Sequence, residues 1–177
     1  MMKKVIGLIA GLAMVLCLTA ACGGENLGPY YEGKTKIGIV GISPDVSDYV
    51  KANMADMENL FLNDKRYVTQ LFYSKDNSEQ LKAADGMVTD RPVDRIEYLL
   101  ISAIDTEGWE GVLNNARDAG IKVFLFDRVI DVPDNLYEAA YFSDTENRED
   151  PNALQFPTQA NRIHERIQEL QRSAGNE

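Results

Sequence analysis

The sequence predicts an α/β fold, a three-layer open parallel sheet followed by a C-terminal amphipathic helix. Three observations predict it. Short apolar or β-branched segments alternate with segments whose apolar residues recur at helical spacing. The alternation runs β-α-β-α-β-α-β and then strand, polar loop and helix, an order typical of parallel sheets covered on both faces. Without an expected leader of 21 residues, 156 of the 177 residues remain, enough for one domain with a sizeable core.

The first half of the alternation consists of two strand–helix pairs. The apolar run KIGIVGI at Lys36–Ile42 predicts a buried strand, and Val46–Asn63 has apolar residues spaced four, three and four apart, as on one helix face. Tyr67–Tyr73 is aromatic and β-branched and predicts the second strand. Ser78–Thr89 again carries apolar residues on one face and predicts the second helix.

The second half follows the same rule. Trp109 belongs to the apolar stripe of its helix, so we expect it in the core, and Gly120 is a stop signal after that helix. The expected elements are, in order, the strand Tyr98–Ser102, the helix Gly108–Ala119, the strands Lys122–Phe126 and Tyr137–Phe142, the polar stretch Ser143–Asn152, and the helix Thr158–Ser173.

The N-terminal residues indicate a bacterial lipoprotein signal peptide. Lys3-Lys4 precede the apolar run Val5–Leu18, and the small residues Ala20-Ala21 stand directly before Cys22. We expect cleavage after residue 21 and lipidation of Cys22, with 22–35 as a tether. Thr19 departs from the usual leucine. A single membrane-spanning anchor is the alternative, but the apolar run is shorter than the ~20 residues that cross a bilayer comfortably.

Charge and composition exclude several classes of function. The leader holds two of the 18 basic residues and none of the 28 acidic ones, so cleavage changes the net charge from −10 to −12. Such an acidic body disfavours nucleic acid as a partner. Cys17 leaves with the leader, and the single histidine, His164, is expected on the surface without companions for a metal site or a catalytic triad. The sequence thus predicts no enzyme, no metal and no cofactor, and lacks G-x-G-x-x-G and Walker A patterns.

The predicted sheet places any ligand beyond the carboxyl ends of its strands. The loops at that edge are Ser43–Tyr49, Ala103–Glu107 and Asp127–Val132, with Ser74–Asn77 as a weaker candidate.

These loops carry a family resemblance. The run TEGWEGVLNNARDAGIKVFLFDRVID at Thr106–Asp131, the first strand KIGIVGI, Gln80 before an apolar helix and the run Tyr141–Asp144 resemble the periplasmic binding protein type I family, especially its galactofuranose and ribose binders. The resemblance covers Lys36–Asp144. It implies one flavodoxin-like lobe with strand order 2-1-3-4-5, while 145–177 remain as polar loop and helix.

The resemblance also implies a sugar site. Asp127 and Arg128 correspond to the Asp-Arg pair that binds sugar hydroxyls, and Tyr49 falls where the family places an aromatic residue. Asp105 faces the same crevice, and Asp144 matches the first residue of a hinge Asp-Asn pair. A carboxylate accepts hydrogen bonds from two hydroxyls, and a guanidinium donates through a rigid fork.

Each of these residues has a simpler interpretation, and the match has departures. An Asp-Arg pair after a strand is usually an exposed turn, an aromatic such as Tyr49 often packs in the core, and Asp105 and Asp144 suit caps or turns. Val50 stands where the galactofuranose binders have arginine, and Thr145 replaces the hinge asparagine. The family closes two lobes on its sugar, whereas the resemblance covers one.

Two functions stay open, with a third ranked last. The first is an extracytoplasmic, membrane-anchored lipoprotein, or a truncated form of one, that binds a monosaccharide for an ABC permease. The alternative is a one-lobe envelope lipoprotein that acts as a sensor or interaction partner of a kinase or permease with little or no sugar binding. An envelope hydrolase ranks last, because the sequence lacks a nucleophile elbow.

Overall fold

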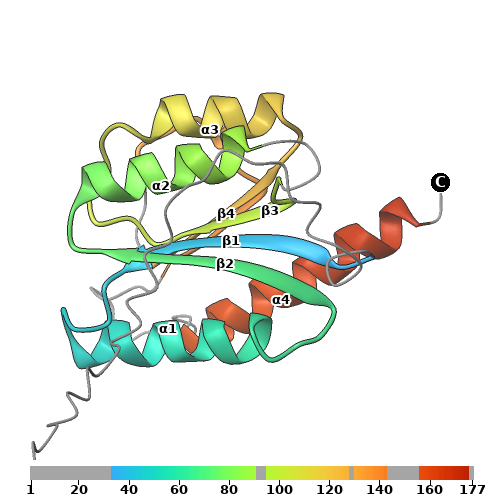
Figure 1. Ribbon diagram of the computed structural model, residues 1–177, viewed down its shortest axis with the longest axis horizontal. Helices are drawn as coiled ribbons and strands as arrows, with labels where there is room; N and C mark the ends of the chain where they lie inside the picture. Colours follow the sequence, from blue (N-terminus) through green and yellow to red (C-terminus); the bar gives the residue numbers. More distant parts are fainter. Residues whose placement is uncertain (1–32, 91–94, 128–129, 143–155, 176–177) are drawn as a thin grey trace, which may run out of the picture.

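A five-stranded parallel sheet forms the middle layer of the computed structural model, which describes residues 33–90, 95–127, 130–142 and 156–175. Its order, β2-β1-β3-β4-β5, confirms the predicted open sheet (Figure 1). Neighbouring strands pair in parallel throughout. The strands are β1 (Thr35–Ile42), β2 (Tyr67–Ser74), β3 (Tyr98–Ile101), β4 (Lys122–Asp127) and β5 (Ala139–Phe142).

Two helices cover each face of the sheet. Figure 1 shows α2 (Asn77–Thr89) and α3 (Trp109–Asp118) on one side, and α1 (Asp48–Phe61) and α4 (Phe156–Ala174) on the other. The helices and the first four strands lie within two residues of their predicted bounds. The last strand begins two residues later than predicted, because the 3-10 helix η1 (Asp134–Leu136) and the residues after it lead into the sheet edge.

The core has two halves, one on each side of the sheet, because successive strand residues point to opposite faces. Ile37 and Ile39 of β1 face α1 and α4, whereas Val40 contributes to the half beneath α2 and α3. Trp109 is fully buried in that second half, as its place on the apolar stripe predicts. Each half contains several side chains with no solvent exposure, so both faces of the sheet are packed.

Helix α4 is an integral part of this core. Ala160, Ile163 and Ile167 are fully buried among residues of α1 and the sheet. On its outer side the Arg166 guanidinium lies 2.7 Å from the Glu138 carboxylate, next to the start of β5. The apolar stripe of the predicted amphipathic helix therefore packs against its own lobe. No helix among the described residues has the length and hydropathy that crossing a membrane requires.

The histidine of α4 corrects one expectation. His164 is not a free surface residue, because its ring is half-buried between Phe61 and Tyr67, with ring centroids 5.6 and 5.8 Å away and edge-to-face geometry. Burial lowers the pKa of His164 below its usual value of 6.5, and the nearby positive charge of Arg66 lowers this pKa further. The folded lobe therefore favours the neutral imidazole.

This preference predicts a pH dependence of stability. In the unfolded chain His164 takes up its proton near pH 6.5, while in the folded lobe it does so at lower pH. The free energy of unfolding is therefore expected to fall as the pH decreases from 6.5 towards the lowered folded-state pKa. His164→Phe keeps an aromatic ring and removes the titration, so urea unfolding from about pH 5 to pH 8 should show a smaller slope in this variant. Equal slopes in the two proteins would contradict the assignment, since the chain has no other histidine.

Candidate functional site

The carboxyl edge of the sheet centres on Asp127, the last residue of β4. Its φ of 67° lies in the left-handed region, and Asp127 is the one non-glycine residue in that region among those described. Aspartate and asparagine enter this region more readily than most residues, yet it still costs free energy relative to extended backbone. Such an outlier at the ligand edge of an open sheet indicates a site that the surrounding structure holds in place.

A serine fixes the Asp127 carboxylate. The hydroxyl of Ser102 donates a hydrogen bond to Oδ2 of Asp127 at 2.7 Å. Ser102 is fully buried directly after β3, and its backbone N–H donates to the Val40 carbonyl at 2.9 Å. The half-buried carboxylate thus rests on a donor that the central strands hold rigidly.

A buried glutamine joins the ends of two central strands. The Gln80 amide Nε2 donates to the carbonyls of Gly41 at 2.7 Å and Ser102 at 3.1 Å, and its Oε1 accepts from the Ile104 N–H at 3.0 Å. Gln80 lies in the first turn of α2 and is fully buried. All three bonds go to backbone groups, so Gln80 sets the spacing of the β1 and β3 ends and the course of the loop after β3.

Sequence reasoning missed Gln159. This residue of α4 is fully buried, and its Oε1 accepts a hydrogen bond from the backbone N–H of Asp127 at 3.3 Å. A signal was present in the sequence, since Gln159 stands four residues before Ile163 and eight before Ile167, on the apolar stripe. A polar residue at a core position of a helix needs a partner, and here the partner is the end of β4.

The remaining predicted site residues divide into two groups. Asp105 lies in the exposed loop after β3, where its Oδ1 accepts from the Thr106 N–H at 2.7 Å, so the structure brings it to the predicted edge in a turn. Tyr49 is the second residue of α1, at the same edge, and its side chain is not among those described. The predicted residues Arg128, Asp144 and Cys22 lie outside the described residues.

Known proteins share part of this sequence and this fold. No family model matches the chain. The fructose import binding protein FruE of Bifidobacterium longum is 32% identical over 137 residues, which are 75% of this chain and 39% of the relative. A crystal structure of a galactofuranose binding protein matches with a TM-score of 0.55 and 26% identity, over 62% of this chain and 36% of that one. Over the part that it contains, this chain belongs to the type I periplasmic binding protein family.

A second solved structure supports the fold. An ABC transporter solute binding protein from Clostridium phytofermentans, with bound β-D-glucose, matches with a TM-score of 0.54 and 24% identity, over 62% of this chain and 32% of that one. The chain thus spans well under half the length of the relatives it matches.

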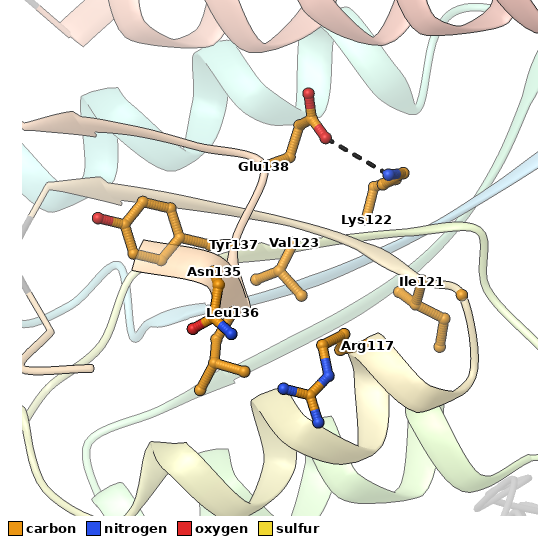
Figure 2. Close-up of a pocket in the computed structure, with 9 residues that line it drawn as sticks. Arg117, Ile121, Lys122, Val123, Asn135, Leu136, Tyr137 and Glu138 are labelled. Atoms are coloured by element: carbon orange, nitrogen blue, oxygen red, sulfur yellow. Dashed lines mark ion pairs between the residues drawn. The ribbon is translucent and has the colours of Figure 1, made fainter. Parts of the chain in front are cut away.

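The described hollows of this periplasmic binding protein lobe lie at the opposite edge. One, with a volume of about 180 Å³, lies at the amino end of β4. Arg117, Lys122 and Glu138 are among the residues that line it (Figure 2). Another, of about 420 Å³, opens between Tyr98, Lys122 and Leu170. Lys122, which lines both, lies at the other end of β4 from Asp127, about 17 Å away at about 3.3 Å per residue. Of their basic side chains, Arg117 and Lys122 are about half exposed and already paired with the carboxylates of Asp118 and Glu138. Buried polar groups converge instead on Asp127, which favours that edge as the site.

The described residues offer no metal site at either edge, because no three His, Cys, Asp or Glu side chains among them cluster to hold an ion.

Removing the Gln80 amide should damage this edge. Gln80→Met keeps the length of the side chain and leaves the Gly41 and Ser102 carbonyls and the Ile104 N–H without their present partner. We expect the free energy of unfolding to fall by about 3 kcal/mol, since each buried backbone group left unpaired costs about 1–3 kcal/mol. Gln70→Met, at an exposed position of β2, serves as control and should change it by less than about 0.5 kcal/mol. Equal urea midpoints for the two variants would contradict the bridging role.

Proposed function

We propose that the chain is an extracytoplasmic solute-binding lipoprotein, or a truncated form of one, that binds a monosaccharide for uptake by an ABC transporter. The observation that carries the proposal is the Asp127 carboxylate, held at the carboxyl end of β4 by the Ser102 hydroxyl. The related proteins are named for fructose import, galactofuranose binding and bound β-D-glucose, which supports a sugar as the ligand class.

The chemistry of Asp127 suits this ligand. A carboxylate offers about four lone-pair directions, so acceptance from Ser102 is compatible with acceptance from a pair of sugar hydroxyls. Arg128, the next residue in the sequence, would donate to a ring oxygen or a further hydroxyl and balance the carboxylate charge when the site is closed to water. Asp105, Tyr49 and Asp144 complete the proposed set. Binding of this kind involves no chemical step and no cofactor.

A titration with sugars tests the proposal. We expect the chain from residue 22 onward to gain thermal stability with at least one of D-fructose, D-glucose, D-galactose and D-ribose, since a ligand at 100 times its Kd stabilises a protein by about 2.7 kcal/mol. Asp127→Asn should weaken binding about tenfold or more, because one charged hydrogen-bond acceptor is lost. Asparagine tolerates the left-handed backbone, so this variant changes the carboxylate and spares the fold. Asp118→Asn, at an exposed position beyond the opposite edge, is the matched control and should bind as the wild type does.

Absence of any shift at millimolar sugar would favour the second function, a one-lobe sensor or interaction protein. One observation supports that alternative. Helix α4 covers the sheet beside α1, so both faces of the sheet are packed within this lobe. A lobe whose two sheet faces are both packed has the means to fold without a bound sugar, as this alternative requires.

We further propose that Cys22 carries a lipid that anchors the protein outside the cytoplasm. The full chain, expressed in a bacterium with labelled palmitate, should incorporate label and sediment with the membranes. Cys22→Ala should abolish labelling, whereas Cys17→Ala, a change inside the expected leader, should leave it intact. Labelling that persists in Cys22→Ala would refute the assignment of this cysteine.

A further inference from the structure

Helix α4 reaches the candidate site from a distant part of the sequence. Gln159 follows Asp127 by 32 residues, yet its Oε1 accepts from the Asp127 N–H. The carboxylate of the same residue accepts from Ser102. One aspartate is thus held at two points, its backbone by α4 and its side chain by the residue after β3.

The backbone contact lies where the sheet no longer constrains β4 on one side. The β3–β4 ladder ends at the pair Ile101–Leu125, two residues before Asp127, while β5 continues beside it to Phe142. Asp127 has a φ of 67°, a conformation that costs free energy and persists only where the surrounding structure holds it. Its orientation therefore depends on how its backbone N–H is held. The Gln159 bond fixes this N–H.

Stability alone does not account for a glutamine at position 159. The side chain is fully buried, and its Nε2 has no hydrogen-bond partner among the described residues. An unpaired buried amide donor costs about 1–3 kcal/mol, whereas one ordinary hydrogen bond contributes about 0.5–1.5 kcal/mol. A methionine would fill the same space without an unpaired amide donor, and the polar interaction lost would be the bond to the Asp127 N–H. The side chain is therefore better explained by what its oxygen does to Asp127.

We propose that Gln159 is a positioning residue of the sugar site, which holds the backbone of Asp127 so that its carboxylate meets the ligand. The inference rests on the proposed sugar binding, and Gln159 acts through Asp127 without touching the ligand. Helix α4 thereby contributes to affinity as well as to the core.

The experiment compares Gln159→Met with Ile167→Val, a matched change of a fully buried residue two turns further along α4. Two quantities are measured, the exchange rate of the Asp127 amide proton by NMR in the free protein and the Kd for the sugar that binds the wild type. In Gln159→Met we expect the Asp127 amide to exchange about tenfold faster and the Kd to rise about tenfold, the factor of one lost hydrogen bond. Ile167→Val should lower the melting temperature and change neither quantity.

Gln159→Glu is the second variant, because a carboxylate oxygen can accept the same bond. Its Asp127 amide should exchange within about threefold of the wild type, since a hydrogen bond to a charged acceptor is at least as strong. The positioning role is overturned if the Asp127 amide exchanges no faster in Gln159→Met than in Ile167→Val, or if the two variants lose affinity equally. If the amide responds as expected while the wild type binds no sugar, the proposed function fails and the structural role of Gln159 on Asp127 stands.

Discussion

The arrangement of the carboxyl edge depends on one buried amide. The Gln80 side chain reaches the ends of both β1 and β3, and its three hydrogen bonds all go to main-chain atoms. Main-chain groups at the end of a sheet have no further strand to pair with, and burying them without partners would be costly. The amide removes that cost and leaves Ser102 in a fixed place. Asp127 in turn takes its orientation from Ser102, so the site follows from a packing requirement of the sheet.

The two glutamines of the edge differ in what they connect. Gln80 comes from a helix that begins three residues before it and joins strands already adjacent in the sheet. Gln159 comes from the last helix and meets the end of β4 through a single bond. Helix α4 is held in place elsewhere, by Ile163 and Ile167 in the core and by the Arg166–Glu138 ion pair near β5. The position of Asp127 therefore depends on the packing of a helix whose main contacts are with α1 and with the face of the sheet that both helices cover.

Much of the fold could be predicted from the sequence because its causes are local. Alternating apolar runs and helical stripes give the elements, and a parallel sheet with short connections leaves few arrangements. The start of β5 was misplaced because Tyr137 looks like a strand residue, although η1 sets the entry to the strand. His164 was expected on the surface because charged residues flank it in the sequence, whereas Phe61 and Tyr67, far away in sequence, enclose it. For the candidate site, the sequence predicted that Asp127 and Asp105 lie at the carboxyl edge of the sheet, but the contacts of Ser102 and Gln159 with Asp127 arise only on folding.

The entry and exit points of the last connection have a consequence for how such lobes change in evolution. Strand β5 ends at Phe142, paired with Asp127, and Gln159 near the start of α4 contacts the same Asp127. The two ends of this connection therefore lie at a single edge, with both faces of the sheet already covered. A segment of any length, from a short loop to a whole additional domain, can be exchanged between these points without opening the core. A change in the length of this connection would therefore leave the packing of the lobe itself unchanged.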